Sequence, residues 1–303
     1  ILIMAHNWDE LSRTTKTIFS FVPLIIGQIL CGYVLLQKQN NIAWRESTSA
    51  FLFFAVGASI ALIGQVYNIP GNLSSFLLTW MLLCLPLIYV MNSSFTSLLY
   101  IAGITYYIVV TGYFYPMSEP YFYWILLLLA LPYYYHLLTK KPNSNFTSFH
   151  NWLIPLSVLI ALGAINNNID ELMFIAYCSL FGVLYLIGHT KYFNEQKLRS
   201  NGYLVMGSLG TVGLLLSLSF DWFWEDLRKQ KLTFDEVLVS PEFIGATVLS
   251  LLGLVLLGVH IKNKGVKALK PIAPVFILFI ITFIIGNYSS IAVVLINLFV
   301  FII

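Results

Sequence analysis

The sequence predicts an all-α fold, a polytopic integral membrane helical bundle with about 11 transmembrane helices and a range of about 10–12. Of the 303 residues, 59% are hydrophobic and only 10% are charged, against about 25% charged residues in a typical soluble domain. The apolar residues gather in long runs, and the charged residues lie between the runs. A soluble fold of this size has too little interior to hide so much apolar surface, so lipid is expected to surround much of it.

A membrane-spanning helix needs about 20 apolar residues. Every backbone group inside the bilayer must be hydrogen-bonded within the protein, and these solid runs favour helices over the alternating strands of a barrel. The sixth and the last two candidates have 16 residues each and are expected to be tilted, incomplete or re-entrant. The candidate spans are residues 17–36, 47–66, 74–91, 95–115, 120–138, 151–166, 171–188, 202–220, 241–260, 271–286 and 288–303.

Residues at the span boundaries favour turns and helix starts. Residues 68–72, Asn-Ile-Pro-Gly-Asn, predict a tight reversal, because proline fixes φ and glycine accepts a positive φ. We expect Ser74 to cap the third helix. Residues 240–242, Ser-Pro-Glu, supply a cap, a first-turn proline and an acid to the ninth. Prolines inside spans each remove a backbone hydrogen bond and predict kinks at Pro23, Pro86 and Pro132.

The charged residues separate when successive connections are assigned alternately to two sides of a membrane. One side has eleven basic and two acidic residues, and the other has five basic and eleven acidic residues. Basic connections stay in the cytoplasm, so residues 6–16 and 221–240 are predicted to face outward. Tryptophans near span ends favour the same layout: Trp8, Trp44, Trp124, Trp152, Trp222 and Trp224.

We predict a single transmembrane domain over residues 1–303. Residues 1–5, Ile-Leu-Ile-Met-Ala, are interpreted as the tail of a preceding span, residues 6–16 as an outer-face segment, and residues 221–240 as an outer-face loop. Three cysteines lie inside apolar runs, without the spacing of a metal or redox pair, and are interpreted as packing residues: Cys31, Cys84 and Cys178.

The second span carries the most informative small and polar residues. Gly57, Ala61 and Gly64 recur at helical spacing, which favours close packing of a neighbouring helix. Packing is the preferred interpretation, and a polar lining near the outer face is the alternative. The candidate ligand-binding residues on that side are Gln65, Tyr67, Asn68, Asp9, His6 and Trp8.

No charged residue lies deep within a span, which argues against proton-coupled transport and leaves a carrier of neutral solutes open. No histidine pair has the spacing of a metal motif, and no nucleophile elbow or phosphate loop is present. We therefore expect no catalytic residue, no metal and no cofactor. The net charge of +3 is too small to favour a nucleic-acid partner.

Two stretches resemble a known family. The first is residues 5–11, Ala-His-Asn-Trp-Asp-Glu-Leu, which run directly into a span. The second is residues 57–67, Gly-Ala-Ser-Ile-Ala-Leu-Ile-Gly-Gln-Val-Tyr, followed by Gly71. Together they resemble the bacterial predicted membrane proteins called domain of unknown function 2157, over roughly the first hundred residues. The resemblance implies an inner-membrane location, and it implies no activity, cofactor or catalytic residue.

Three functions remain open from the sequence. The working interpretation is a transporter-like or solute-binding helical bundle with a polar cavity bordered by Gln65. The alternative is a scaffold, sensor or assembly subunit of an envelope complex, and the second alternative is a membrane-embedded enzyme acting at the outer face. A non-enzymatic role is favoured over an enzymatic one. The expected partners are membrane lipids, an envelope protein and a small-molecule ligand of unknown identity. The enzyme would require convergence of His6, Asp9 and Glu119 or Asp170.

Overall fold

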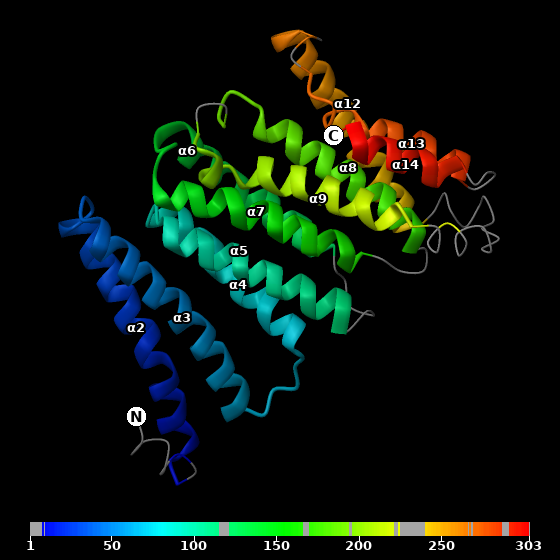
Figure 1. Ribbon diagram of the computed structural model, residues 1–303. Helices are drawn as coiled ribbons and strands as arrows, with labels where there is room; N and C mark the ends of the chain where they lie inside the picture. Colours follow the sequence, from blue (N-terminus) through cyan, green and yellow to red (C-terminus); the bar gives the residue numbers. More distant parts are fainter. Residues whose placement is uncertain are drawn as a thin grey trace. The chain divides into compact units, whose positions relative to one another are not determined.

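The computed structural model describes residues 8, 10–114, 121–165, 170–193, 196–220, 224, 240–265, 267, 269–286 and 291–302. These residues form eleven α-helices and no strand, so the predicted all-α fold is confirmed (Figure 1). The helices are α2 (Arg13–Gln37), α3 (Ile42–Val66), α4 (Leu73–Val90), α5 (Ser94–Val109), α6 (Phe122–Lys140), α7 (Asn145–Ala164), α8 (Asp170–Gly188), α9 (Gly202–Leu218), α12 (Pro241–Lys264), α13 (Val275–Gly286) and α14 (Ile291–Ile302).

Each predicted span overlaps one of these helices. Within the described ranges, seven helical segments are long and apolar enough to cross a membrane, among them α2 and α3 with 25 residues each. A helix of 25 residues is about 37 Å long and exceeds the hydrocarbon thickness of about 30 Å. The sixth predicted span becomes the 20-residue α7, whereas α13 and α14 have 12 residues each, or about 18 Å. The fourth continues beyond α5 as a π-helix, Val110–Phe114.

The helix ends correct two sequence predictions. Asn72, and not Ser74, caps α4, because its side-chain oxygen accepts a 2.8 Å hydrogen bond from the Ser75 N–H. Asn68, with φ of 49°, takes the left-handed conformation in the reversal, and Gly71 does not. A short polar side chain tolerates that conformation, so the glycine was not needed for the turn. The predicted start of α12 is confirmed, with Ser240 as the cap.

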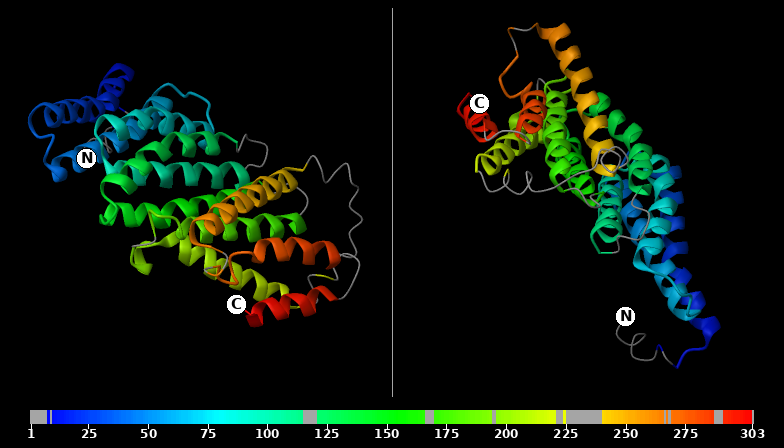
Figure 2. Two further views of the ribbon diagram at one scale, coloured as in Figure 1. Left: turned by 90° about the horizontal axis from the view of Figure 1, so that it is seen from above. Right: turned by 90° about the vertical axis from the view of Figure 1, so that its right-hand side faces the viewer.

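The chain divides into two compact units, residues 1–137 and 138–303. The first contains α2 to α5 and most of α6. In it α2 and α3 form an antiparallel pair, α4 packs on α3, and α5 packs on both α3 and α4 (Figures 1 and 2). Its buried side chains include Met81, Tyr100 and Ile104. The single domain over residues 1–303 stays a prediction.

The second unit is built around α8, which packs against α12, α9, α13 and α7. The short helices α13 and α14 pack against one another, and α14 also packs on α9. Phe276, Phe279 and Trp224 lie in its core. Trp224 was expected in the headgroup zone, but it is fully buried and its indole Nε1 donates a 3.0 Å hydrogen bond to the carbonyl of Leu218.

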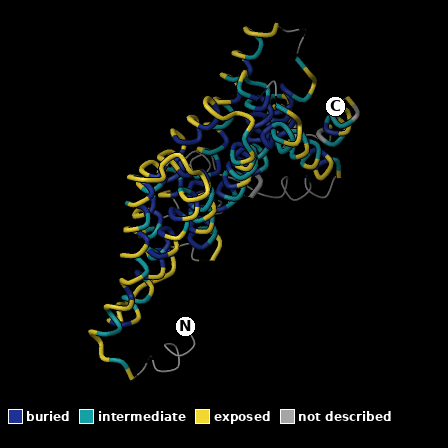
Figure 3. The backbone as a smooth tube through the Cα atoms, turned by 90° about the vertical axis from the view of Figure 1, so that its left-hand side faces the viewer, coloured by how far each residue is buried: buried dark blue, intermediate teal, exposed yellow. Residues whose placement is uncertain are grey.

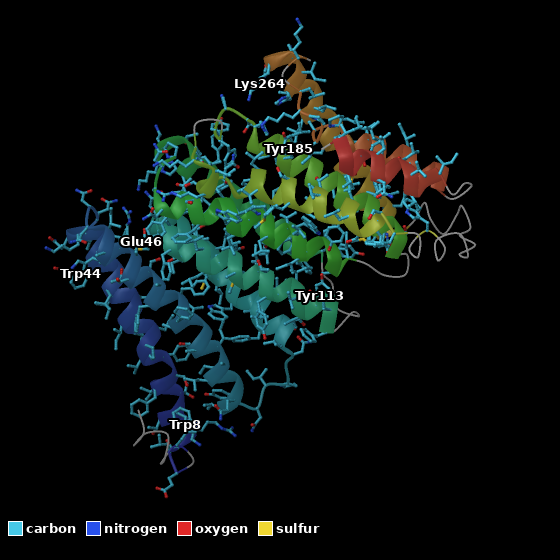
Figure 4. The ribbon with its side chains drawn as sticks, viewed as in Figure 1. Trp8, Trp44, Glu46, Tyr113, Tyr185 and Lys264 are labelled. Carbon is cyan, nitrogen blue, oxygen red and sulfur yellow. The ribbon has the colours of Figure 1, made fainter. Side chains whose placement is uncertain are left out.

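Large apolar side chains remain exposed along the helices. On α2 they include Ile18, Ile25 and Ile29, and much of the α2–α3 pair is exposed or half-buried (Figure 3). Trp8 lies near the start of α2, and Trp44 lies beside the opposite end of that helix (Figure 4). Apolar sides with tryptophans at the two ends are typical of helices that face lipid between two headgroup layers.

Candidate functional site

The α2–α3 pair approaches closely at small residues. A Cβ atom on Gly27 would lie 3.0 Å from the Cδ1 atom of Leu52 on α3. Further toward the start of α2, the Ser59 hydroxyl donates a 2.8 Å hydrogen bond to the carbonyl of Ser20. These two contacts, one steric and one polar, fix the register of the pair.

The contact between α3 and α4 depends on Gly57 and Trp80. A Cβ atom on Gly57 would lie 2.5 Å from the Trp80 ring, so only glycine leaves room for the indole there. The indole Nε1 of Trp80 donates a 2.8 Å hydrogen bond to the carbonyl of Phe53, which holds the ring in place. The structure therefore places Gly57, one of the three predicted packing residues, directly at a helix–helix contact.

A hollow of about 970 Å³ opens between α2, α3 and α4. Along α3 its lining extends from Val56 to Gly64, a rise of about 12 Å. Along α4 the lining extends from Leu73 to Leu83, a rise of about 15 Å. The connection between the two helices, residues 69–72, closes one end. The hollow lies entirely within the first unit.

The walls of the hollow are mainly apolar, and no charged residue lines it within the described part of the chain. The large apolar lining residues are Phe21, Leu24, Val56, Ile60, Ile63, Ile69, Leu73, Phe76 and Leu83. Five polar side chains interrupt this surface: Gln28, Ser59, Asn72, Ser75 and Thr79.

The polar lining residues differ in what they already bind. Asn72 caps α4, Ser59 bonds across to α2, and the Thr79 hydroxyl donates to the carbonyl of Ser75 at 2.8 Å. The side-chain amide of Gln28 makes no hydrogen bond with any described residue. Gln28 lies next to Gly27, which contacts Leu52 on α3. Leu52 is further from the α3–α4 connection than Val56, the last lining residue of α3 in that direction. The amide of Gln28 therefore lies at the end of the hollow opposite the connection.

The predicted ligand-binding residues do not come together as one lining. Ala61 and Gly64 do line the hollow, although they were assigned to packing, and a Cβ on Gly64 would meet nothing within 4 Å. Gln65, Tyr67 and Asn68 are exposed and lie outside the lining. The hollow is bordered by Gly64 and by Gln28, and Gln65, which was expected to border a polar cavity, lies outside its lining.

The residues predicted near the outer face partly gather at the start of α2. The hydroxyl of Tyr67 accepts a 3.1 Å hydrogen bond from Thr17, and the Arg13 guanidinium lies 5.8 Å from its ring centroid. The Lys16 ammonium lies 5.9 Å from the ring of Trp8. His6 and Asp9 lie outside the described residues, as does Glu119, and the side chain of Asp170 is not described either.

Sequence reasoning missed a buried carboxylate near the beginning of α3. Glu46 accepts hydrogen bonds from the backbone N–H groups of Ser94, at 3.1 Å, and Phe95, at 2.8 Å, in the first turn of α5. The Ser93 hydroxyl also donates to this carboxylate. A negative charge at a helix N-terminus is favourable because the free N–H groups carry partial positive charge. The sequence had shown Glu46 only as one acid in a basic connection.

The surroundings of Glu46 are polar and buried. Ser49 and Thr96 share a 2.6 Å hydrogen bond between α3 and α5, and the hydroxyls of Ser94 and Tyr133 are 3.0 Å apart. Arg45 supplies the nearest cation, with 3.9 Å between its Nη2 atom and Glu46 Oε1. This cluster joins α3, α5 and α6, and its carboxylate is already held by three donors, so it is a structural site.

Within the described ranges, no three histidine, cysteine, aspartate or glutamate side chains gather closely enough to hold a metal ion. The three cysteines are buried and unpaired as thiols, which agrees with a packing role.

Comparisons with known proteins bear on the first unit. The model of the family "Predicted membrane protein (DUF2157)" matches residues 1–97, which include α2, α3, α4 and the hollow between them. Neither the curated proteins nor the solved structures contain a match. The match includes both stretches, residues 5–11 and 57–67, that carried the resemblance. Residues 1–97 are thus similar to this family of predicted membrane proteins, and the described part of the chain holds several helices long and apolar enough to cross a membrane.

Proposed function

We propose that the first unit binds an uncharged amphiphile, a lipid-like molecule with an apolar body and few hydrogen-bonding groups, in the hollow between α2, α3 and α4. The observation that carries the proposal is the hollow itself, about 970 Å³ with apolar walls and a few polar groups. Ligand pockets commonly measure about 300–1,000 Å³ and have this kind of lining.

The absence of charge in the lining selects the class of ligand. A buried ion requires a counter-charge or several strong donors, and the described lining offers neither. An apolar chain gains from leaving water or from close contact with Phe76 and Leu83. The ligand in the hollow is therefore neutral and mainly hydrocarbon.

Two polar positions orient such a ligand. Asn72 and Ser75 lie at the end closed by the α3–α4 connection, where an alcohol or ester group would find hydrogen-bond partners. Gln28 lies at the far end and offers an amide that binds no described residue. An amide among apolar groups is costly when unpaired, so a hydroxyl or carbonyl on the ligand would be stabilised there.

The orientation of the protein belongs to this proposal. Basic connections in the cytoplasm put the α3–α4 connection on the outer side of a bacterial inner membrane, with residues 6–16 and 221–240 also outside. The end of the hollow that residues 69–72 close then lies at the level of the outer leaflet. We infer that the unit takes its ligand from that leaflet, as a binding step of a transporter-like bundle.

Filling the hollow tests the proposal. Gly64→Leu adds a side chain where a Cβ meets nothing within 4 Å, inside the lining. Gly32→Leu is the matched control, because its Cβ also meets nothing within 4 Å and Gly32 lies outside the lining. Both variants of the full chain are purified from membranes, and the retained neutral lipids are identified by mass spectrometry.

The expected result is a loss of one class of neutral lipid in Gly64→Leu and its retention in Gly32→Leu. A second pair, Gln28→Leu and Gln65→Leu, tests hydrogen bonding to the ligand, whereas the glycine pair tests the space available to it. Gln28→Leu should lower the retention of hydroxyl-bearing lipids, and Gln65→Leu should not. Equal lipid content in all four variants would overturn the proposal.

A further inference from the structure

In the second unit, α8 and α12 bring two basic connections together at one end. The Lys264 ammonium donates a 3.1 Å hydrogen bond to the carbonyl of His189, although 75 residues separate them in the sequence. The rings of His189 and His260 meet edge to face with 5.8 Å between their centroids. Figure 4 labels Lys264 at the end of α12 and Tyr185 on α8, one turn before His189.

Two segments at this end are strongly basic: residues 189–201, which follow α8, and residues 261–274, which comprise the last turn of α12 and the connection after it. They hold seven lysine and arginine residues and one acid, Glu195, which lies outside the described residues. We name His189, His260, Lys264, Lys267 and Lys270 the basic face. Arg45 and Glu46 form the one ion pair found among described residues, so neither Lys267 nor Lys270 has a carboxylate partner in that part of the chain.

The electrostatics of His189 show the excess of positive charge. Its Nδ1 atom lies 3.0 Å from the carbonyl of Tyr185, and because a carbonyl only accepts, Nδ1 carries the hydrogen. Burial lowers the pKa of His189, the hydrogen bond to the Tyr185 carbonyl opposes this shift, and repulsion by Lys264 and Lys270 adds to it, so that the pKa is lowered on balance. The imidazole therefore favours its neutral form beside two lysines that lie close enough to act on it.

An exposed apolar stripe leads along α12 to this end. Val248, Leu251, Val255 and Val259 recur at helical spacing and are each about half exposed or more. Lys262 follows three residues later, one turn before the connection that carries Lys267. An apolar stripe that ends in lysines matches the two parts of a phospholipid, acyl chains along the helix and a charged headgroup at its end.

We propose that the basic face binds the phosphate group of an anionic phospholipid at the membrane surface. The lysines supply the charge complementarity, and the stripe on α12 supplies the contact for the acyl chains. Under the orientation proposed above, this is the inner leaflet. The binding site is separate from the hollow of the first unit, and it takes an anionic ligand where the hollow takes a neutral one.

The test uses the full chain in detergent, titrated with phosphatidylglycerol, with phosphatidylcholine of the same acyl chains, and with inorganic phosphate. Binding is followed by native mass spectrometry. The variant K264Q/K267Q/K270Q removes the lysines of the basic face. The matched control K38Q/K140Q/K141Q removes three basic residues from other connections predicted on the same side.

We expect phosphatidylglycerol to bind more tightly than phosphatidylcholine, and its affinity to fall about fivefold for each lysine of the basic face removed at low salt. The control variant retains the affinity. The single variant Lys270→Gln, at an exposed position, gives the same direction of change if the triple variant unfolds.

A second readout is the imidazole resonance of His189, assigned with His189→Gln. An anion bound beside it stabilises the imidazolium, so phosphatidylglycerol raises the pKa of His189 and phosphatidylcholine does not. Gly64→Leu leaves both readouts unchanged, which separates this site from the hollow. Equal binding of the two lipids, an equal loss in the control variant, or saturation by inorganic phosphate in place of lipid would each overturn the proposal.

Discussion

The backbone N–H of Phe95 donates a 2.8 Å hydrogen bond to the carboxylate of Glu46, which joins the first turn of α5 to the beginning of α3. Two further donors, the Ser93 hydroxyl and the Ser94 N–H, complete the contact. Glu46 is 9% exposed, so little water competes for its oxygens. Glu46 therefore supplies the hydrogen-bond acceptors that water would otherwise provide to the free N–H groups of α5, although α5 begins 48 residues later in the sequence.

Replacing this carboxylate should weaken the first unit. Glu46→Gln removes the negative charge and turns one acceptor into a donor that faces N–H groups. Hydrogen bonds to charged groups contribute about 1.5–3 kcal/mol each, so we expect the free energy of unfolding to fall by about that amount or more. Denaturant unfolding in detergent measures it. Glu10→Gln, at an exposed position, is the control, and an equal stability of the two variants would contradict this role.

Glycines on one helix should respond in opposite directions to the same substitution. Gly57→Ala places a methyl group 2.5 Å from the Trp80 ring, which is held by its hydrogen bond to Phe53, and should destabilise the protein by about 1–3 kcal/mol. Gly64→Ala meets nothing within 4 Å and should stabilise α3 by up to about 1 kcal/mol. Thermal unfolding of both variants compares them, and destabilisation by Gly64→Ala would show that the hollow is filled by protein.

The start of α4 offers a test of the corrected cap. Asn72→Ala removes the acceptor of the Ser75 N–H and should cost about 1 kcal/mol of stability. Ser74→Ala removes only the hydroxyl that donates to Asn72, and its cost should be smaller. Hydrogen exchange of the Ser75 amide reads the cap directly. Faster exchange in Ser74→Ala than in Asn72→Ala would return the cap to the residue first predicted from the sequence.

His189 should make stability depend on pH in a defined window. Burial, followed by Lys264 and Lys270, lowers its pKa below the ordinary value of 6.5. At a pH between the lowered pKa of His189 in the folded chain and its pKa of 6.5 in the unfolded chain, only the unfolded chain binds the proton. The free energy of unfolding is therefore highest above pH 6.5 and falls as the pH drops below that value. Unfolding midpoints from about pH 8 to pH 5 should fall less in His189→Gln than in wild type or Thr190→Ala.

The helices could be predicted from the sequence because hydropathy alone marks a run that lipid must surround. Their ends were harder to predict. Arg13 to Lys16, and Arg45 with Glu46, are polar enough to end an apolar run, but they lie in the first turns of α2 and α3, directly after the caps Ser12 and Asn41. The capping residues Ser12 and Asn41 mark these helix starts in the sequence, but a hydropathy profile does not detect them.

The candidate site was predicted only in part, because a lining depends on which helices become neighbours. The small residues of α3 pointed to the correct helix face, and Gly64 lines the hollow. Gln28 was not predicted as a lining residue, because the hollow that it lines forms only when α4, which is distant in the sequence, packs beside α3. Glu46 was missed for the same reason. Its partners are on α5, and a carboxylate in a basic connection shows nothing of them.

Photo-crosslinking measures the central claim most directly. A neutral lipid with a photoactivatable group on its acyl chain is incorporated with the full chain into bilayers, and the crosslinked residues are mapped by mass spectrometry. The account predicts crosslinks concentrated on lining residues such as Ile60 and Phe76, and their loss in Gly64→Leu but not in Gly32→Leu. Crosslinks spread evenly over exposed residues such as Ile18, Ile25 and Ile29, and unchanged by Gly64→Leu, would contradict it.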